Sequence, residues 1–149
     1  MPSPLTLSLL ARWLHVLAAI TWIGGMLFVA LVLVPAIRRE DPALRRRLVQ
    51  AVGLRFRAVG WAALAVLVTT GLVNLWLAPF LLGAPRFHAK LGLVALALIL
   101  QALHDFVLGP RASAPGADPS LRIRASWIAR INVLIVLVIV LLGLSLLRY

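Results

Sequence analysis

Four long apolar segments constrain the fold of this sequence more than any other feature. Each segment is at least as long as the stretch of about 20 residues that an α-helix needs to cross the hydrocarbon core of a bilayer. The segments cover residues 13–37, 58–82, 89–109 and 127–147. The connections between them are too short for a separate soluble domain, and no internal repeat is evident. The sequence therefore predicts a single all-α membrane domain over residues 1–149, folded as a four-helix bundle.

The composition supports a membrane protein and excludes several kinds of site. The chain is 63% hydrophobic and only 13% charged, far from the mixed composition of soluble domains. It has no cysteine, so disulfides, thiolate metal sites and thiol redox chemistry are excluded. The net charge of +11 does not indicate a nucleic-acid partner, because the aromatic residues lie in or beside the spans rather than among the basic residues.

The basic residues predict how the chain is oriented in the membrane. Eleven of the 15 lysines and arginines lie after the first span, after the third span or at the start of the fourth: Arg38, Arg39, Arg45, Arg46, Arg47, Arg55, Arg57, Arg111, Arg122, Arg124 and Arg130. The positive-inside rule therefore places residues 38–57 and 110–126 in the cytoplasm and both termini outside. This N-out, C-out topology is expected for a multi-pass protein of a bacterial-type inner membrane. Asp41 is a predicted N-cap with Pro42 at the first helical position, so the second span should begin as a helix before it enters lipid.

The third span carries polar side chains on two opposite faces. On a helical wheel at about 100° per residue, one stripe contains Lys90, Ala97, Gln101 and His104. His88 lies on nearly the opposite face, about 24 Å from His104 along the helix axis. One ion therefore cannot bind both histidines. A structural hydrogen bond between Gln101 and His104 would explain the same stripe without a functional role.

The first span places a histidine on a face of small and apolar residues. The residues that share this face are His15, Ala18, Ala19, Trp22, Gly25 and Met26. Small side chains allow a neighbouring helix to approach closely. In the second span, Thr70 and Asn74 lie one turn apart, and such side chains commonly form hydrogen bonds between helices.

These polar groups are expected to form two layers. The outer layer would contain His15, Asn74, His88 and Lys90, and the inner layer Gln101, His104, Asp105, Arg130 and Asn132. Ionisable residues within spans usually face a bundle interior, a cavity or a partner, so a functional site is the first hypothesis for them. Two alternatives are structural. Lys90 and His88 lie close enough to the interface to snorkel, and Asp105 can pair with Arg130.

The histidines narrow the chemistry that these layers could support. Imidazole binds copper, zinc, iron and nickel, and two imidazoles from separate helices can hold a haem iron. A relay for Cu(I) prefers thiolate or thioether ligands, but the only methionines are Met1 and Met26. The sequence thus favours a histidine site for Cu(II) or haem. Proton translocation through Lys90, His104 and Asp105 is a further alternative.

One family resemblance covers most of the chain. The segment LARWLHVLAAITWIGGMLFVALVLVPAIRR, residues 10–39, resembles the opening helix of copper-resistance D (CopD) type membrane proteins. It shares with them a histidine, then tryptophan and glycines, then a proline before basic residues. The later stretches TTGLVNLW and FHAKLGLVAL agree in general character. The resemblance implies a histidine-based metal centre for copper transport or tolerance, with His15 as the first ligand. His88 is the expected partner, because both histidines belong to the predicted outer layer.

A more distant resemblance is to the HemJ-type protoporphyrinogen oxidases, which are also four-span proteins. The positions that match are His15, Lys90-Leu91 and Arg130-Ile131-Asn132. The sequence departs from that family's pattern at VPAIRRE after the first span and at Val133-Leu134-Ile135 after the asparagine. This resemblance implies haem b, with His15 and a histidine of the third span as axial ligands and Lys90 as the candidate catalytic residue.

Three functions are therefore compatible with the sequence. The first is a CopD-like protein that handles copper, and the second is a haem b-binding redox enzyme. The third is a structural or assembly subunit in which the polar layers only hold helices together. The supporting polar residues would be Trp22, Asn74, Lys90, Gln101, Asp105, Arg130 and Asn132. The expected partners are the lipid bilayer, a metal ion or haem, and a second copy of the chain in a homo-oligomer.

Overall fold

The described part of the chain is entirely built from helices and their connections. A computed structural model covers residues 4–114 and 116–146, and over these residues it contains no strand. Four helical segments within them are long and apolar enough to cross a membrane: Leu5–Arg39, Pro42–Leu77, Pro85–Ser113 and Pro119–Ser145. The predicted all-α membrane fold with four spans is confirmed. Residue 147, the predicted end of the fourth span, lies outside the described residues.

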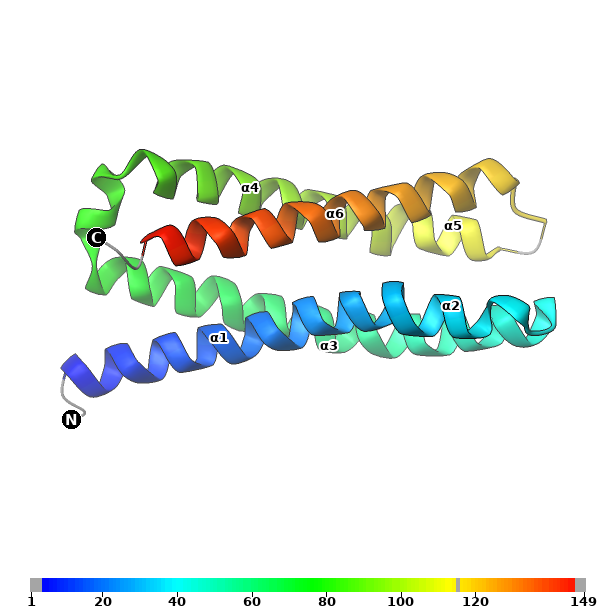
Figure 1. Ribbon diagram of the computed structural model, residues 1–149, viewed down its shortest axis with the longest axis horizontal. Coiled ribbons are helices and arrows are strands. Elements are labelled where there is room, and N and C mark those ends of the chain that lie inside the picture. Colours follow the sequence, from blue (N-terminus) through cyan, green and yellow to red (C-terminus); the bar gives the residue numbers. More distant parts are fainter. Residues whose placement is uncertain (1–3, 115, 147–149) are drawn as a thin grey trace. The chain divides into compact units, whose positions relative to one another are not determined.

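The helices form two compact units, Met1–Leu81 and Leu82–Tyr149. In the first, α1 (Pro4–Phe28) continues through a π-helical turn, η1 (Val29–Leu33), and the short elements α2 (Val34–Ala36) and η2 (Ile37–Arg39). The chain then reverses into α3 (Pro42–Leu77), which is followed by the 3₁₀ turn η3 (Pro79–Gly83). Figure 1 shows α1 and α3 side by side and antiparallel.

Small residues let α1 and α3 approach each other. Ala18 of α1 and Gly60 and Ala63 of α3 are buried, and the Trp22 side chain lies directly against Gly60. Gly25 is in similarly close contact with the Phe56 ring, because a Cβ at position 25 would overlap that ring. In a membrane, such close backbone approach supplies the van der Waals contacts that hold helices together. The face predicted for the first span meets α3 at His15, Trp22 and Gly25.

The second unit repeats the same plan. Its first helix, α4 (Pro85–Ala102), continues through a π-helical turn, η4 (Leu103–Leu108), and the short α5 (Gly109–Ser113). The chain then returns as α6 (Pro119–Ser145), which runs beside α4 (Figure 1). Ala97, Asn132 and Val136 are almost fully buried in this unit. Each unit thus consists of a helix, a π turn, a short helix and a returning helix. This recurrence was not evident in the sequence, because the side chains of the two units differ.

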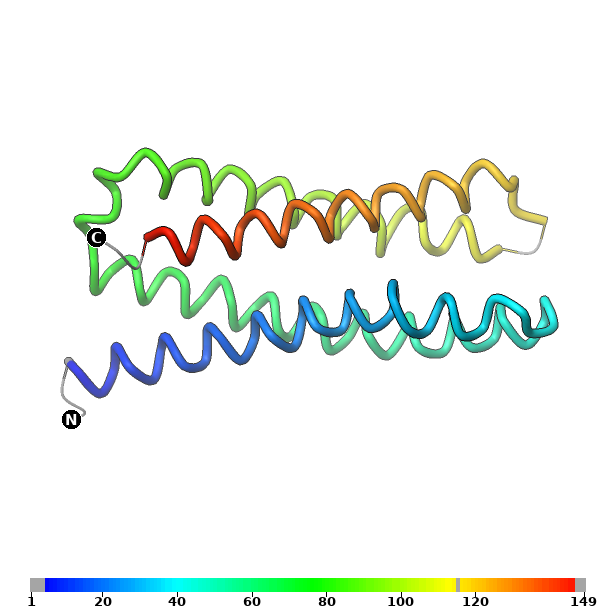
Figure 2. Tube along the Cα trace, viewed as in Figure 1, coloured from blue at the N-terminus to red at the C-terminus, as the bar shows by residue number. Residues whose placement is uncertain are grey.

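A proline follows the π turn in each unit. Pro35 and Pro110 lack the N–H that would continue the α-helical ladder, and their rings crowd the preceding turn. Each ladder widens just before its proline. The N–H of Val34 donates to the carbonyl of Val29, and the N–H of Gly109 donates to that of His104. Because of this widening the span Leu5–Arg39 continues past its proline, and in Figure 2 the tube runs on from blue to cyan as one coil.

Position 109 leaves little room for a side chain, although a valine, Val34, forms the corresponding π-turn bond in the first unit. A Cβ at position 109 would lie 2.9 Å from the carbonyl oxygen of His104, the group that accepts the π-turn hydrogen bond. The segment from Gly109 to Ser113 is helical. The helical ladder continues there because the π turn places the proline at the start of a new helical turn, where a missing N–H leaves no bond unmade.

An aspartate and a proline begin the returning helix in both units. The Asp41 carboxylate accepts hydrogen bonds from the N–H groups of Ala43 and Leu44, which confirms the predicted N-cap. Asp118 caps α6 in the same way through the N–H and hydroxyl of Ser120. These bonds, with Arg124 nearby, lower the pKa of Asp118 below its ordinary value. As predicted, the second span is already helical from Pro42, well before its apolar part begins.

Candidate functional site

His15 is held by a hydrogen bond to the facing helix. Its Nδ1 lies 2.9 Å from the hydroxyl oxygen of Thr70 in α3. The Thr70 hydroxyl is itself 2.6 Å from the carbonyl oxygen of Val66, one turn earlier in the same helix. A hydroxyl has a single proton, and a carbonyl can only accept. The threonine therefore donates to Val66, and the imidazole donates its Nδ1–H to the threonine.

This arrangement fixes the tautomer of the imidazole. With the proton on Nδ1, the lone pair of the neutral ring is on Nε2. Histidines that bind metals generally donate their other ring N–H to an oxygen of the protein, which orients the ring and raises the basicity of the ligating nitrogen. Thr70 is such an oxygen for His15. Sequence reasoning gave Thr70 only a general helix-to-helix role, since the register that brings it opposite His15 is not visible in the sequence.

Gly71 lies beside the His15 ring, and Asn74 follows one turn beyond Thr70 along α3. A Cβ on Gly71 would lie 3.5 Å from Cε1 of His15, so the ring rests on the glycine backbone. Asn74 lies one turn beyond Thr70, and its side-chain Oδ1 is buried with no hydrogen-bond partner among the described residues. An acceptor without a donor is unfavourable by about 1–3 kcal/mol unless a water, ion or ligand satisfies it. Sequence reasoning missed Gly71, whose only signal was a glycine inside a span.

Trp22 belongs to the core of the first unit rather than to the surroundings of His15. It lies two helical turns further along α1, and it is buried against Gly60. Its indole N–H has no hydrogen-bond partner within the described part of the chain. Met26 is also buried, one turn beyond Trp22, about 16 Å along the axis from His15. A single ion cannot bind both Met26 and His15.

The inner polar layer forms a chain of hydrogen bonds in the second unit. Asn132 of α6 donates from Nδ2 to Oε1 of Gln101 at 3.0 Å. Gln101 in turn donates from Nε2 to Asp105 at 2.8 Å, and the other carboxylate oxygen of Asp105 is 3.0 Å from Nδ1 of His104. The predicted grouping of these four residues is correct. Gln101 bonds to Asp105 and Asn132 rather than to His104, because the π turn brings Asp105 between them.

Arg130 is the exception within this layer. Its guanidinium lies over the ring of Trp127, 5.3 Å from the ring centroid. The alternative in which Arg130 pairs with Asp105 is therefore wrong. Residues 127 and 130 are neighbours on the helix surface, and the aromatic face attracts the cation on the exposed side of α6.

Replacing Asn132 by leucine is expected to destabilise the second unit. The change leaves Oε1 of Gln101 without its donor, and hydrogen bonds of this kind between membrane helices contribute about 0.6 kcal/mol on average and up to about 1.7 kcal/mol. Unfolding in mixed micelles with increasing dodecyl sulfate would measure the loss. Ile131→Leu is the matched control, since Ile131 is the exposed neighbour of Asn132. Equal unfolding of the two variants would show that the hydrogen bond contributes nothing.

His88 and Lys90 point in different directions, as the helical wheel predicts. His88 is exposed, and its Nδ1 lies 3.3 Å from the carbonyl oxygen of Ala84 at the start of α4. Lys90 is half-buried and turns toward α6, where its Nζ would lie 3.6 Å from a Cβ on Gly143. No hydrogen-bond or ion-pair partner of Lys90 occurs among residues 4–114 and 116–146. His15 belongs to the first unit and His88 to the second, and the predicted pairing of these two imidazoles stays a prediction.

The donor set available for a metal is small. In the described ranges, no group of three or more His, Cys, Asp or Glu side chains could hold a metal ion. Within the first unit the candidate donors are the imidazole of His15 and, one turn beyond its partner Thr70, the amide oxygen of Asn74. Nitrogen and oxygen donors of these kinds suit Cu(II). The residues present therefore fit a copper ion that binds to few protein ligands.

Comparisons with known proteins give the chain a family. The family model described as copper resistance protein D matches residues 50–146, a stretch that includes Thr70, Asn74 and the second unit up to residue 146. An uncharacterized protein of Aquifex aeolicus (strain VF5) is 36% identical over 134 residues, which are 88% of this chain and 89% of that protein. No solved structure matches. The family match does not address the HemJ-type resemblance, so haem stays an alternative prediction. The chain is a multi-pass membrane protein that belongs to the copper resistance protein D family.

Proposed function

We propose that this protein handles copper as its cargo and that His15 is the ligand through which it does so. The observation that carries this proposal is the hydrogen bond from His15 Nδ1 to Thr70, whose own proton is directed to Val66. The bond directs the Nδ1 proton to Thr70, so the neutral ring carries on Nε2 the lone pair with which it would bind copper, and the bond holds the ring in a fixed orientation. We choose copper because imidazole is a suitable ligand for it and because the family is described by copper resistance.

The proposal extends to the direction from which copper reaches the site. Arg38 and Arg39 lie at the turn between α1 and α3, and Arg111 and Arg122 lie near the turn between α5 and α6. The positive-inside rule supports a cytoplasmic position for both turns, in a bacterial-type inner membrane. His15 lies in the half of α1 that is far from the turn, so it is the outer side of the membrane that would deliver or receive copper. The orientation is testable with single introduced cysteines, because the chain has none of its own.

Cellular copper content tests the proposed function. In cells that lack their own copper exporter, production of the wild-type chain is expected to change both cell-associated copper and growth in copper-containing medium. His15→Ala is expected to abolish both changes while it accumulates in the membrane to the same level. Zinc and nickel content serve as internal controls. Copper content that is identical with the wild-type chain, with His15→Ala and with no chain at all would refute the proposal.

Two further measurements separate the alternatives that the sequence leaves open. His88→Ala in the same cells tests the second predicted imidazole independently of His15. An absorption spectrum of the protein purified from its native membrane tests the haem alternative, because haem b has an intense band that copper–imidazole complexes lack. A strong haem spectrum that disappears in His15→Ala would favour the redox enzyme over copper handling.

A further inference from the structure

The helices of the first unit are much longer than a bilayer requires. Its two spans contain 35 residues, Leu5–Arg39, and 36 residues, Pro42–Leu77. About 20 residues suffice to cross the hydrocarbon core, so each helix has roughly 15 residues to spare, or roughly 22 Å. The question is at which end of the unit this extra length lies.

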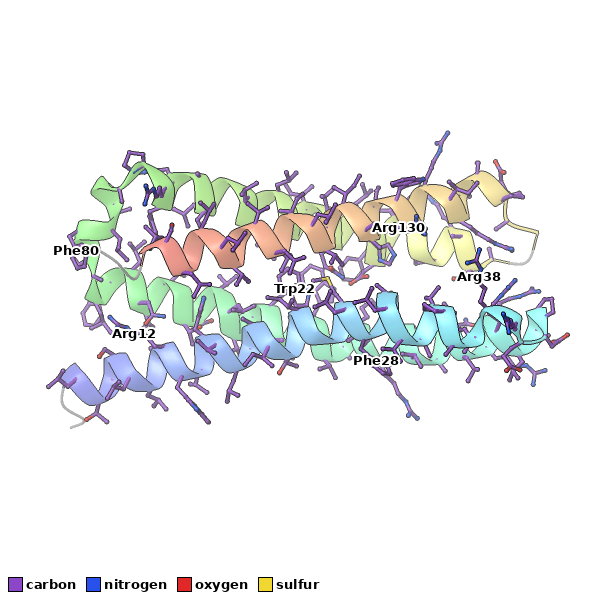
Figure 3. All side chains as sticks on the ribbon, in the orientation of Figure 1. Arg12, Trp22, Phe28, Arg38, Phe80 and Arg130 are labelled. Atoms are coloured by element: carbon purple, nitrogen blue, oxygen red, sulfur yellow. The ribbon has the colours of Figure 1, made fainter. Side chains whose placement is uncertain are left out.

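The register between the two helices decides where the extra length lies. His15 meets Thr70, Trp22 meets Gly60, and Gly25 meets Phe56. Arg55 and Arg57, which flank Phe56, are therefore at the level of Gly25 rather than at the level of the turn. Figure 3 shows Arg38 at the turn, with Phe28 and then Arg12 progressively further from it.

The apolar part of α3 fixes the position of the hydrocarbon core. From Arg57 to Trp76 is about 28 Å along the helix, which matches the thickness of the core, and no charged residue lies between them. The Trp76 side chain is 74% exposed, as expected of a tryptophan at the membrane interface. The extra length therefore lies beyond Arg55 and Arg57. We call this part, residues 28–57, the turn end of the first unit.

The turn end has an apolar helix beside a basic one. On the α1 side, Phe28, Leu31 and Val34 are all exposed, and Leu31 is 69% exposed. On the α3 side, Arg45, Arg46 and Arg47 are exposed. Seven arginines and two acidic residues give the turn end a net charge of +5: Arg38, Arg39, Arg45, Arg46, Arg47, Arg55 and Arg57 against Glu40 and Asp41.

Neither water nor hydrocarbon suits a surface of this kind. Water would leave the apolar side chains of residues 28–36 hydrated, and the hydrocarbon core would strip water from the guanidinium groups. The interfacial layer offers acyl chains to the apolar side chains and phosphate oxygens to the guanidinium groups. Arginine is especially suited to phosphate, because its planar fork of N–H groups can form two parallel hydrogen bonds.

We propose that the turn end lies in the head-group layer and binds anionic phospholipids. Its apolar side chains dip into the acyl region, and Arg45, Arg46 and Arg47 bind phosphate groups. The net charge of +5 already includes the Asp41 carboxylate, which accepts hydrogen bonds from the N–H groups of Ala43 and Leu44. Charge complementarity selects the occupant, because a net charge of +5 favours anionic lipid over neutral lipid.

The position of the turn end can be measured with spin labels. A nitroxide on a single cysteine at Leu31 is compared with one at Val16, an exposed residue of α1 at the level of the core. In nanodiscs containing phosphatidylglycerol, the label at Val16 should be accessible to oxygen and not to a water-soluble nickel complex, and the label at Leu31 to both. Accessibility at Leu31 to nickel alone would place the turn end in water, where a protein partner could cover it. A profile identical to that of Val16 would place it in the core. Either result overturns the proposal.

The lipid preference needs a separate measurement. Native mass spectrometry of the purified full chain should show retained phosphatidylglycerol and little phosphatidylcholine. A triple variant, Arg45→Gln, Arg46→Gln and Arg47→Gln, should weaken retention about 100-fold, since each basic residue near the surface contributes about fivefold. Arg12→Gln, at the opposite end of the unit, is the matched control. Equal lipid retention by the triple variant and the wild type, or equal competition by inorganic phosphate, would contradict the proposal. In the spin-label measurement, nanodiscs expose both faces of the bilayer, so that result does not depend on the orientation in which the chain inserts.

Discussion

Replacing His15 by alanine is expected to weaken copper binding by at least about 100-fold, because it removes the nitrogen that the proposed function assigns to the metal. Loss of the residue that is hydrogen-bonded to a metal ligand commonly lowers metal affinity 10- to 100-fold. Loss of the ligand itself should therefore exceed that range. Equilibrium dialysis of Cu(II) against the purified protein in nanodiscs measures the effect. Thermal unfolding of the same samples shows whether the fold has changed.

Variants of Thr70 make this prediction sharper. Thr70→Val keeps the shape of the side chain but removes the oxygen that accepts the Nδ1–H of His15. Copper affinity should fall by roughly 10- to 100-fold, because the ring loses both its orientation and its fixed tautomer. Thr70→Ser keeps the hydroxyl and should restore most of the affinity. Unchanged binding by His15→Ala would remove this residue from the site, and failure of Thr70→Ser to rescue would remove the hydrogen bond from the explanation.

Gly25→Ala is expected to destabilise the first unit by about 1–3 kcal/mol, the usual penalty of overpacking a close contact. An added Cβ at this position overlaps the ring of Phe56, which must move aside. Gly24 provides a control on the same helix, since a Cβ there has nothing within 4 Å. Gly24→Ala should be neutral or slightly stabilising, because alanine is the better helix former. Unfolding in dodecyl sulfate mixed micelles compares the two.

A double variant tests the physical reason for this difference. In Phe56→Leu the smaller side chain leaves room for a Cβ at position 25, so Gly25→Ala should be much less destabilising in that background. Coupling between contacting residues of this kind amounts to about 0.5–3 kcal/mol. Equal destabilisation by Gly24→Ala and Gly25→Ala, or a Gly25→Ala effect that is the same with and without Phe56, would show that the close contact does not hold α1 and α3 together.

The faces on which the polar residues of the third span lie could be predicted from the sequence. The helical wheel correctly separated the face with Lys90 and Gln101 from the face with His88. This separation depends only on the 3.6-residue period of the helix, which is a local property. The Asp41 cap was predictable for the same reason, since a cap involves only the first turn of its own helix. The second cap, at Asp118, has the same Asp-Pro signal but was not predicted.

Contacts between helices were much harder to predict. The Asp105–Arg130 pair was plausible from charge alone, but Arg130 lies over Trp127 instead. The roles of Gly71 beside His15 and Gly143 beside Lys90 were also missed. Each of these depends on which residues of the partner helix lie opposite, and an apolar span has many registers of similar hydrophobic burial. The close contacts at Gly25 and Gly60 select one of them through shape.

The sequence by itself determined the number of spans, their helical character and the faces on which the polar residues lie. These properties follow from the length and period of apolar runs, because lipid cannot satisfy unpaired backbone groups and thereby requires a helix. Only the tertiary structure decided that His15 meets Thr70, that Asn132 meets Gln101 and that Arg57 lies level with Gly25. The physical reason is that helix register depends on close packing of particular side chains against particular glycines, and not on hydrophobicity, which is nearly uniform along each span.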